Sequence, residues 1–299
     1  MLMKIFLLWF FISGALIYIF GRRELLAVWR EPVLRRPVLI IESDDWGAGP
    51  DNQSSVLAEI LGLLESFSDS DGRRPVMTLA IVLATANGSK IKSTGSYQRI
   101  SISDEAYKPL LKTINKGVGA GGFSVQLHGL EHFWPAALMT ASEDDNAIKD
   151  WLCKAPFAAT EDLPSPLQSR WVDASVLPAR PLARTDVLGA AREEVDTFQS
   201  VFAIKPEVAV PPTFVWNRDV EQAWAAAGVG VIITPGRRFE TRDERGQPAG
   251  SGALIYNGQF GEGGTIYLVR DVYFEPSLGH TAEQALAALL SKVQLCRPA

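Results

Sequence analysis

The sequence predicts an α/β fold built around a parallel sheet, which a single β/α barrel would satisfy. Apolar runs alternate along the chain with stretches of helical periodicity, and this is the β-α-β rhythm of a parallel sheet. With 299 residues and a hydrophobic content of 47%, the chain can build one large core. We find no internal repeat and no low-complexity tract, which favours one domain over a repeat array.

The elements follow in order after a hydrophobic N-terminal segment. We predict strands over residues 38–41, 76–83, 123–127, 207–210 and 229–234. We predict helices over residues 54–67, 104–116, 186–202, 218–227 and 281–295. Residues 154–185 are rich in proline and lack periodicity, so we expect a long excursion over the face where the strands end. Residues 236–252 are polar and glycine-rich, which predicts a loop, and residues 253–256 are expected to pair with 265–269.

Residues 5–20 form an apolar stretch without charge, and residues 1–3 and Gly21 can extend it toward the about 20 residues that a membrane span needs. A cleaved signal peptide and a helix packed on the domain are the alternatives. No A-x-A-like cleavage site follows, which favours a retained anchor. We therefore divide the chain into an anchor helix (1–21), a basic linker or amphipathic helix (22–36) and a barrel (37–299).

Positive charge is heavier after this segment than before it. Lys4 precedes the segment, and the positive residues that follow it are Arg22, Arg23, Arg30, Arg35 and Arg36. The positive-inside rule then favours a membrane-associated protein with its domain on the cytoplasmic side, and a periplasmic domain stays open. The net charge of −5 and the absence of long basic runs argue against a nucleic-acid partner. Two cysteines, Cys153 and Cys296, are too few for a disulfide framework and do not fix the compartment.

Two pairs of polar residues follow apolar runs and look like the halves of one metal site. Asp44 and Asp45 come directly after the run 38–41, and His128 and His132 follow another run. Two imidazoles and one carboxylate make a three-ligand Zn²⁺ site with a position left open for water, which is the catalytic arrangement. The second carboxylate could take a proton from that water. Alone, an Asp-Asp pair is often only a turn or a helix cap.

The segment 128–132 also fits the H-x-x-E-H pattern of inverzincin peptidases. That chemistry needs one continuous helix, which Gly129 weakens and Pro135 would end. We therefore favour a loop at the end of a strand, with Glu131 as a supporting group behind the ligands and not as a general base.

With these motifs the chain resembles the polysaccharide deacetylase superfamily, also called NodB-like or carbohydrate esterase family 4, and within it the bacterial surface-glycan branch. The resemblance covers roughly residues 37–299 and implies an irregular barrel of seven or eight β/α units. It also implies that Asp44 is the general base and that Asp45, His128 and His132 bind a divalent metal, most plausibly Zn²⁺.

The family's third motif, which lines the substrate groove, is matched only loosely by residues 210–217. Flat rings beside the motifs could stack on sugars, although ordinary packing explains them equally well. The substrate-binding candidates are Trp46, Trp134, Pro212, Trp216 and Asn217. Arg237, Arg238 and Arg270 could bind an acidic sugar or a phosphate, but surface arginines are common and we assign them no role.

In the resembling family a final strand carries a histidine that protonates the leaving amine, and this chain ends before such a strand. We expect either a truncated chain or an enzyme without that acid. His280 is the remaining candidate for a catalytic acid, although its place before the helix 281–295 also fits an exposed N-terminal residue.

The predicted function is metal-dependent removal of an acyl group, most plausibly N-acetyl, from a bacterial surface glycan or its lipid-linked precursor. The partners are then a glycan and, through the N-terminal segment, a membrane. A catalytically inactive glycan-binding protein of the same fold is the main alternative. A glycoside hydrolase on the same barrel would need a second carboxylate across the cleft, which the sequence does not place.

Overall fold

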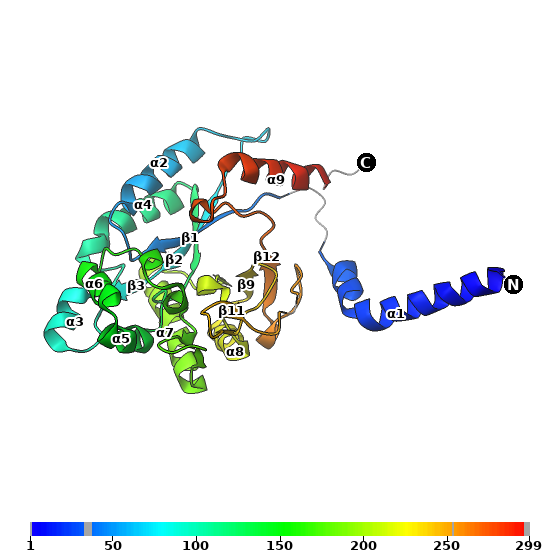
Figure 1. The fold of residues 1–299 in the computed structure, drawn as a ribbon. Coiled ribbons are helices and arrows are strands. Elements are labelled where there is room, and N and C mark those ends of the chain that lie inside the picture. Colours follow the sequence, from blue (N-terminus) through cyan, green and yellow to red (C-terminus); the bar gives the residue numbers. More distant parts are fainter. Residues whose placement is uncertain (1, 33–37, 253, 296–299) are drawn as a thin grey trace.

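The structure is a computed structural model that describes residues 2–32, 38–252 and 254–295 (Figure 1). Its centre is a sheet of six parallel strands. In spatial order these are β1 (Ile41–Gly47), β2 (Met77–Val82), β5 (Phe123–Leu127), β8 (Val208–Ala209), β9 (Val231–Thr234) and β12 (Ile266–Val269). Each next strand in the sheet also comes later in the chain, so the sheet winds in one direction, as in a β/α barrel.

Helices connect the strands and cover the outside of the sheet (Figure 1). The helix that follows β1 in sequence packs against the helix that precedes β5. The helices before and after β8 in sequence form a second packed pair. The first pair is α2 (Gln53–Glu65) with α4 (Lys108–Gly119), and the second is α7 (Arg184–Phe202) with α8 (Arg218–Ala227). Local sequence sets the ends of α8, because the Asn217 side chain accepts the N–H of Val220 and Gly228 ends the helix with φ of 102°.

Smaller elements build the rim of the barrel. The short helices are α3 (Gly88–Thr94), α5 (Pro135–Asp144) and α6 (Asn146–Lys154). Three antiparallel pairs join β3 (Ala84–Ala86) to β4 (Arg99–Ser101), β6 (Val172–Asp173) to β7 (Arg180–Pro181), and β10 (Thr241–Arg242) to β11 (Pro248–Ala249). Single 3₁₀ turns span Glu105–Tyr107, Thr160–Asp162, Ser165–Gln168, Pro212–Phe214, Glu262–Gly264 and Pro276–Leu278. The last helix is α9 (Ala282–Leu295).

The two edge strands of the sheet are joined by side chains. Arg270, directly after β12, donates hydrogen bonds to Glu42 and Asp44 of β1. Because β1 and β12 are the opposite edges, the sheet must curve until these edges face one another. The prediction of an α/β fold around a parallel sheet is confirmed, and the main sheet has six strands within the described residues, against the seven or eight β/α units that the resemblance implied. Arg270 closes the gap between its edges.

The core lies on both sides of the sheet. The largest cluster fills the space between the strands and the outer helices, with Leu57, Leu79, Ile81, Phe198 and Trp224 among its fully buried members. A second cluster joins α5 and α6 to the segment after residue 154. Its buried members include Phe133, Leu138, Trp151, Leu163 and Leu167. This cluster fixes the excursion against the loop that carries the paired histidines.

Most predicted elements match the structure, and three differ. The first strand is Ile41–Gly47 and not 38–41, so both aspartates lie inside it. The predicted pairing of residues 253–256 with 265–269 is wrong, because β12 pairs with β9 and Leu254 bridges to Arg237 instead. The predicted loop 236–252 contains the β10–β11 hairpin. Ala253, the linker residues 33–36 and Cys296 lie outside the described residues, and Cys153 is a free, exposed thiol.

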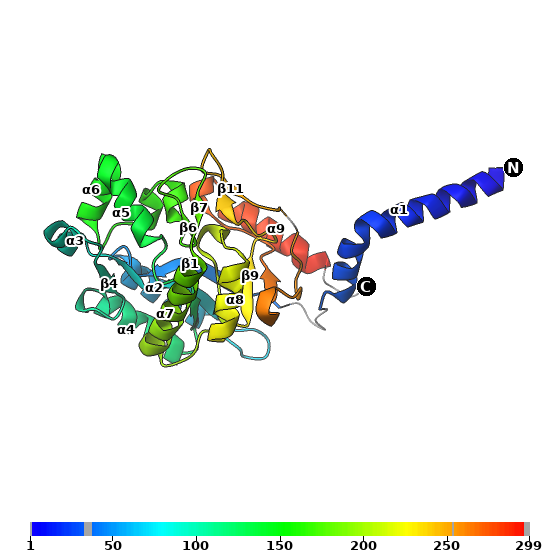
Figure 2. The ribbon, with the colours of Figure 1, turned by 90° about the horizontal axis from the view of Figure 1, so that it is seen from below.

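The N-terminal helix α1 (Leu2–Arg30) stands away from the sheet in both ribbon views (Figures 1 and 2). It takes in the predicted anchor and runs on into the segment predicted as a basic linker or amphipathic helix. Its stretch Leu2–Arg22 is long and apolar enough to cross a membrane, and none of that window is buried. A signal sequence would have the same properties.

Candidate metal centre

A β-bulge places both aspartates of β1 at one site. The register between β1 and β2 slips between Ser43 and Trp46, so β1 has one residue more than β2 in this stretch. Asp45 sits in the left-handed region with φ of 65°, which is uncommon for a residue other than glycine. Successive side chains of a regular strand point to opposite faces, and a bulge re-aims them. The strained backbone therefore explains how two adjacent carboxylates can serve one centre.

Gly47 ends the bulge where no side chain fits. A Cβ atom there would lie 2.1 Å from the Val82 carbonyl oxygen, and φ is 124°. We expect Gly47→Ala to lower the free energy of unfolding by about 3 kcal/mol, because the strand must shift and the backbone is strained. Urea titration measures this. Gly62→Ala is the control, since a Cβ atom there meets open space within α2. Equal stability of the two variants would contradict the prediction.

The paired histidines lie on a loop between β5 and α5, as predicted, and not on a helix. His128 directly follows β5, and its Nδ1 lies 2.8 Å from the Val210 carbonyl oxygen. This contact orients the ring so that Nε2 faces the aspartates. The rings of His128 and His132 meet edge to face, with centroids 4.9 Å apart. Both histidines are buried.

Asp45, His128 and His132 converge on one point. The Asp45 Oδ1 atom lies 3.2 Å from Nε2 of His128 and 3.1 Å from Nε2 of His132. Two ligands of a tetrahedral Zn²⁺ at about 2.0–2.1 Å from the ion lie about 3.3 Å apart, so the donor spacing fits that metal. The Asp45 side chain is 41% exposed while both rings are buried, which leaves one side of the cluster open to solvent. These are the properties of a three-ligand site with an accessible position.

The charges within this cluster reinforce one another. Burial by itself would raise the pKa of Asp45, but the charge of His132 and the hydrogen bonds from His128 and His132 hold it well below its usual value. Burial by itself would lower the pKa of His128, but Asp45, Asp44 and the Val210 carbonyl raise it. The site thus keeps a carboxylate ionised beside two imidazoles, and a divalent metal would have to displace the proton that these contacts favour on His128.

Asp44 faces a different partner. Both of its oxygens accept hydrogen bonds from the Arg270 guanidinium, each at 2.6 Å. The Arg270 Nε atom lies 3.2 Å from Glu42, and the other Glu42 oxygen accepts from Gln126 at 3.0 Å. Burial alone would lower the pKa of Arg270, but Asp44 and Glu42 outweigh it and raise that pKa. A bidentate arginine fixes the plane of the Asp44 carboxylate, which is next in sequence to the candidate metal ligand Asp45.

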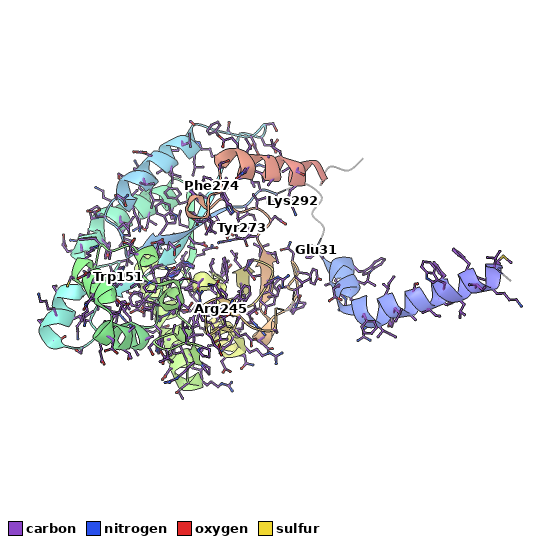
Figure 3. All side chains as sticks on the ribbon, in the orientation of Figure 1. Glu31, Trp151, Arg245, Tyr273, Phe274 and Lys292 are labelled. Carbon is purple, nitrogen blue, oxygen red and sulfur yellow. The ribbon has the colours of Figure 1, made fainter. Side chains whose placement is uncertain are left out.

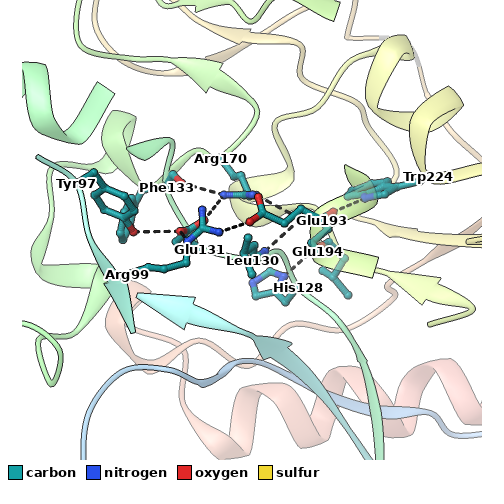
Figure 4. Close-up of polar contacts among 11 residues, drawn as sticks. Tyr97, Arg99, His128, Leu130, Glu131, Phe133, Arg170, Glu193, Glu194 and Trp224 are labelled. Carbon is teal, nitrogen blue, oxygen red and sulfur yellow. Dashed lines mark hydrogen bonds and ion pairs between the residues drawn. The ribbon is translucent and has the colours of Figure 1, made fainter. Parts of the chain in front are cut away.

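Behind the histidine loop, Glu131 is fully buried. Its carboxylate accepts hydrogen bonds from Arg170 at 2.6 Å and from the Tyr97 hydroxyl at 3.1 Å, and it forms an ion pair with Arg99 at 2.8 Å (Figure 4). Its partners are Tyr97, Arg99 and Arg170, and Asp45 is not among them. This placement agrees with the sequence interpretation that Glu131 supports the ligands and is not a general base.

Glu194 extends the same network and is expected to make stability depend on pH. Burial raises its pKa to about 7, against the opposing effect of Arg170 and the hydrogen bonds from Trp224 and Leu130. A raised folded pKa means that the contribution of Glu194 to stability is fully present below pH 4.5 and is lost as pH rises through about 7. The loss should be about 3 kcal/mol.

Chemical denaturation between pH 4.5 and 8 measures this slope. Glu194→Gln should flatten it, because the amide does not titrate. Glu193→Gln is the control, since that side chain is exposed on the same helix and its variant should keep the slope of the wild type. A Glu194→Gln slope equal to that of the wild type would refute the prediction.

The predicted substrate residues do not all line the site. Trp46 and Trp134 are half-buried next to the ligands, and the Trp46 Nε1 atom is buried without a partner among the described residues. Pro212 packs beside Gly129 of the histidine loop. Asn217 caps α8. Trp216 is fully buried and donates to Glu221, so a sugar cannot reach its ring, and this placement corrects the prediction of a substrate contact there.

His280 lies on the segment that precedes α9. Its Nδ1 atom accepts the N–H of Glu275 at 3.2 Å. No contact among the described residues brings it to Asp45 or to either of the paired histidines. Its role as a catalytic acid stays a prediction.

The structure adds three groups that the sequence did not single out. Arg270 was treated as an ordinary surface residue, and it is mostly buried against Asp44. Burial raises the pKa of Tyr273 to about 12, with Arg270 opposing and Asp44 adding to the shift, so this phenol stays protonated near that pair. Tyr273 lies on the segment between β12 and α9 (Figure 3). The pKa of Glu161, on the proline-rich excursion, is also raised, first by burial and further by the charge of Asp45.

No family model matches the chain, and no curated protein matches it. Among solved structures it is similar to a polysaccharide deacetylase from Bacillus cereus, with 10% identity, a TM-score of 0.36, and coverage of 84% of this chain and 50% of that one. It is also similar to the Streptococcus pyogenes deacetylase PplD in complex with acetate, with 11% identity, a TM-score of 0.37, and coverage of 88% and 74%.

A third similar structure is a pseudoenzyme of the CE4 family from Bacillus anthracis, with 11% identity, a TM-score of 0.33, and coverage of 66% of this chain and 43% of that one. The chain spans half the length of the Bacillus cereus protein. At such low scores these likenesses carry no argument about activity, and the site stands on the geometry described above.

Proposed function

We propose that this protein is a metal-dependent hydrolase that removes an acyl group, most plausibly N-acetyl, from a bacterial polysaccharide or a lipid-linked glycan precursor. The observation that carries the proposal is the convergence of Asp45, His128 and His132 on one solvent-open point, with Asp44 next to it on the same bulge. The motif resemblance to polysaccharide deacetylases supports the reaction class. The metal is a divalent ion, for which two imidazoles and a carboxylate favour Zn²⁺.

The residues of this chain suit hydrolysis of an amide. A bound divalent ion would polarise the acyl carbonyl and lower the pKa of an attacking water. Asp44 takes a proton from that water, and its carboxylate is already oriented by Arg270. When the carbon–nitrogen bond breaks, the amine nitrogen needs a proton, and the protonated Asp44 is the donor at hand. The net reaction converts an amide and water into a carboxylate and a protonated amine.

We also propose that α1 holds the protein at a membrane. Its apolar stretch is exposed along its whole length, which is unfavourable in water but suits hydrocarbon. The heavier positive charge after the span supports a cytoplasmic domain. Protease protection in sealed membrane vesicles tests this orientation, and release of the protein by carbonate extraction would count against an inserted helix.

The experiment that tests the site is metal content by mass spectrometry after dialysis against a weak chelator. Near-stoichiometric Zn²⁺ or another divalent ion is expected in the wild type, and none in Asp45→Ala or His128→Ala. His280→Ala is the matched control, because it removes the third histidine outside the cluster and should keep the metal. Absence of metal from folded wild-type protein would overturn the proposal. Release of acetate from N-acetylated glycans then tests the reaction.

His280→Asn should leave deacetylation within about twofold of the wild type. His280 makes its contact on the segment before α9 and has none with the metal ligands. Acetate release measured over a range of pH checks this. A large loss of kcat together with a lost basic limb in the pH profile would instead assign the proton donor to His280.

A second candidate function is glycan binding without turnover. The observation that favours it is that His280 contacts the Glu275 backbone and, among the described residues, makes no contact with Asp45 or the paired histidines. Such a protein would retain its metal and bind glycan while releasing no acetate.

A further inference from the structure

The loop that carries the paired histidines is enclosed by a chain of buried ion pairs (Figure 4). In order along the chain of contacts these are Arg99, Glu131, Arg170 and Glu194. Arg99 reaches the surface, where it pairs with Glu193 of α7, and the other three are fully buried. This series of ion pairs therefore starts at Glu193 on the exposed face of α7, passes through Glu131, which precedes His132, and returns to α7 at Glu194.

Two of these residues hold the backbone of the loop from outside. The Glu194 Oε2 atom accepts the N–H of Leu130 at 3.1 Å and also the Arg170 Nε–H at 3.2 Å. Arg170 in turn donates to the Phe133 carbonyl at 3.4 Å. The loop is thus held on both sides of Glu131 and His132 by residues that belong to other segments.

The loop also lies directly on Arg170. A Cβ atom at Gly129 would be 3.2 Å from the Arg170 Cδ atom and 3.3 Å from the Pro212 Cγ atom, and φ of Gly129 is 99°. Only glycine allows the backbone to approach this closely in that conformation. Arg170 is therefore both an ion-pair partner and the surface against which the loop packs.

The two histidines differ in what orients them. The Nδ1 atom of His128 has a fixed partner in the Val210 carbonyl, whereas the buried Nδ1 atom of His132 has none among the described residues. A metal-binding histidine usually has its second nitrogen held by a hydrogen bond. Apart from its Nε2 contact with Asp45 and its ring contact with His128, the His132 ring is positioned through its backbone, which Glu131 anchors at the preceding residue.

The cost of burying these charges points to a purpose beyond stability. Apolar residues of similar volume often replace a buried ion pair without loss of stability, so such a network is weak evidence for stabilisation. The forked guanidinium of an arginine, in contrast, fixes the orientation of its partners, because it holds carboxylates in defined planes.

We propose that Glu131, Arg170 and Glu194 are positioning residues that set the ring of His132 for the metal. This inference rests on the proposed metal site. It extends that site to residues that do not contact the metal. It predicts that substituting these residues weakens metal binding more than a substitution elsewhere in the core that lowers stability by the same amount.

The test compares Glu131→Gln with Glu221→Gln. Glu221 is also fully buried and is paired with Arg238, the Tyr267 hydroxyl and the Trp216 indole, but it lies away from the histidine loop. The dissociation constant for Zn²⁺ is measured by competition with a chromophoric chelator. We expect Glu131→Gln to raise it about 10- to 100-fold and Glu221→Gln to leave it within about twofold.

A readout on the metal-free protein separates positioning from general destabilisation. Imidazole nitrogen NMR spectra of Glu131→Gln should show a changed His132 resonance and an unchanged His128 resonance. If Glu131→Gln does not fold, Arg170→Lys carries the test, since it keeps the charge and loses the fork between Glu131 and Glu194. Its dissociation constant should rise by at least about fivefold.

The outcomes are distinguishable. Folded wild-type protein that binds no Zn²⁺ overturns the proposed function and this inference with it. Wild-type binding that Glu131→Gln or Arg170→Lys leaves unchanged overturns the inference alone. An equal loss of affinity in Glu221→Gln also overturns it, because any buried ion pair would then have the same effect.

Discussion

Asp44→Asn should lower the rate of deacetylation by about 10² to 10⁴ while leaving the bound metal in place. The amide has the shape of the carboxylate and its oxygen can still accept from Arg270, but it cannot take a proton from water. The metal ligands Asp45, His128 and His132 are unchanged in this variant. Acetate release under single-turnover conditions, together with metal content, measures both effects.

Glu42→Gln is the matched control for this prediction. It removes one negative charge from the same Arg270 and keeps the shape of the side chain, but Glu42 lies further back along β1 and contacts Gln126. A loss of activity confined to Asp44→Asn assigns the proton transfer to Asp44. Equal losses of activity in both variants would instead mean that activity depends on neutralising the positive charge of Arg270 and not on a base at Asp44. Loss of metal from Asp44→Asn would make Asp44 a ligand.

Arg270→Met should destabilise the fold by about 3–5 kcal/mol, because it leaves two mostly buried carboxylates without a cation. Side chains of Glu42 and Asp44 are only 10% and 18% exposed. The same substitution removes the side chain that joins β12 to β1, so the curvature of the sheet is no longer held at its open edge. Denaturant unfolding monitored by tryptophan fluorescence measures the loss.

Arg184→Met serves as the control for this loss. That arginine is 65% exposed, its pair with Asp219 lies on the surface, and exposed pairs contribute only about 0–1 kcal/mol. If Arg270→Met is no less stable than Arg184→Met, the ion pairs of Arg270 do not hold the edges together. If the variant folds, we also expect it to lose activity while keeping its metal, because Asp44 is no longer oriented.

Much of the architecture can be predicted from local sequence. The strand 123–127 and the helix 218–227 were predicted with the bounds that the structure has, because each is a continuous periodic stretch between clear end signals. The first strand was placed too early. Its polar residues Glu42 to Asp45 do not resemble a buried strand, and their place in the sheet depends on pairing with β2.

The bulge at Asp45 has no sequence signature either, since a left-handed aspartate is allowed only because the neighbouring strand over-determines it. Trp216 shows the same limit. Its position beside a polar motif suggested a groove, but burial depends on what packs above it, and here the Glu221 carboxylate and the surrounding core enclose the ring.

The sequence by itself predicted the α/β fold class and the candidate residues Asp44, Asp45, His128 and His132, of which the structure brings Asp45, His128 and His132 together. It could do so because strand ends meet at one edge of a parallel sheet, so motifs at two strand ends predict one site. Only the tertiary structure decided what surrounds them. Arg270 stands 226 residues from Asp44 in the chain, and such a pair leaves no local periodicity. Curvature of the sheet brings these two residues together, and curvature is a property of all the strands packed at once.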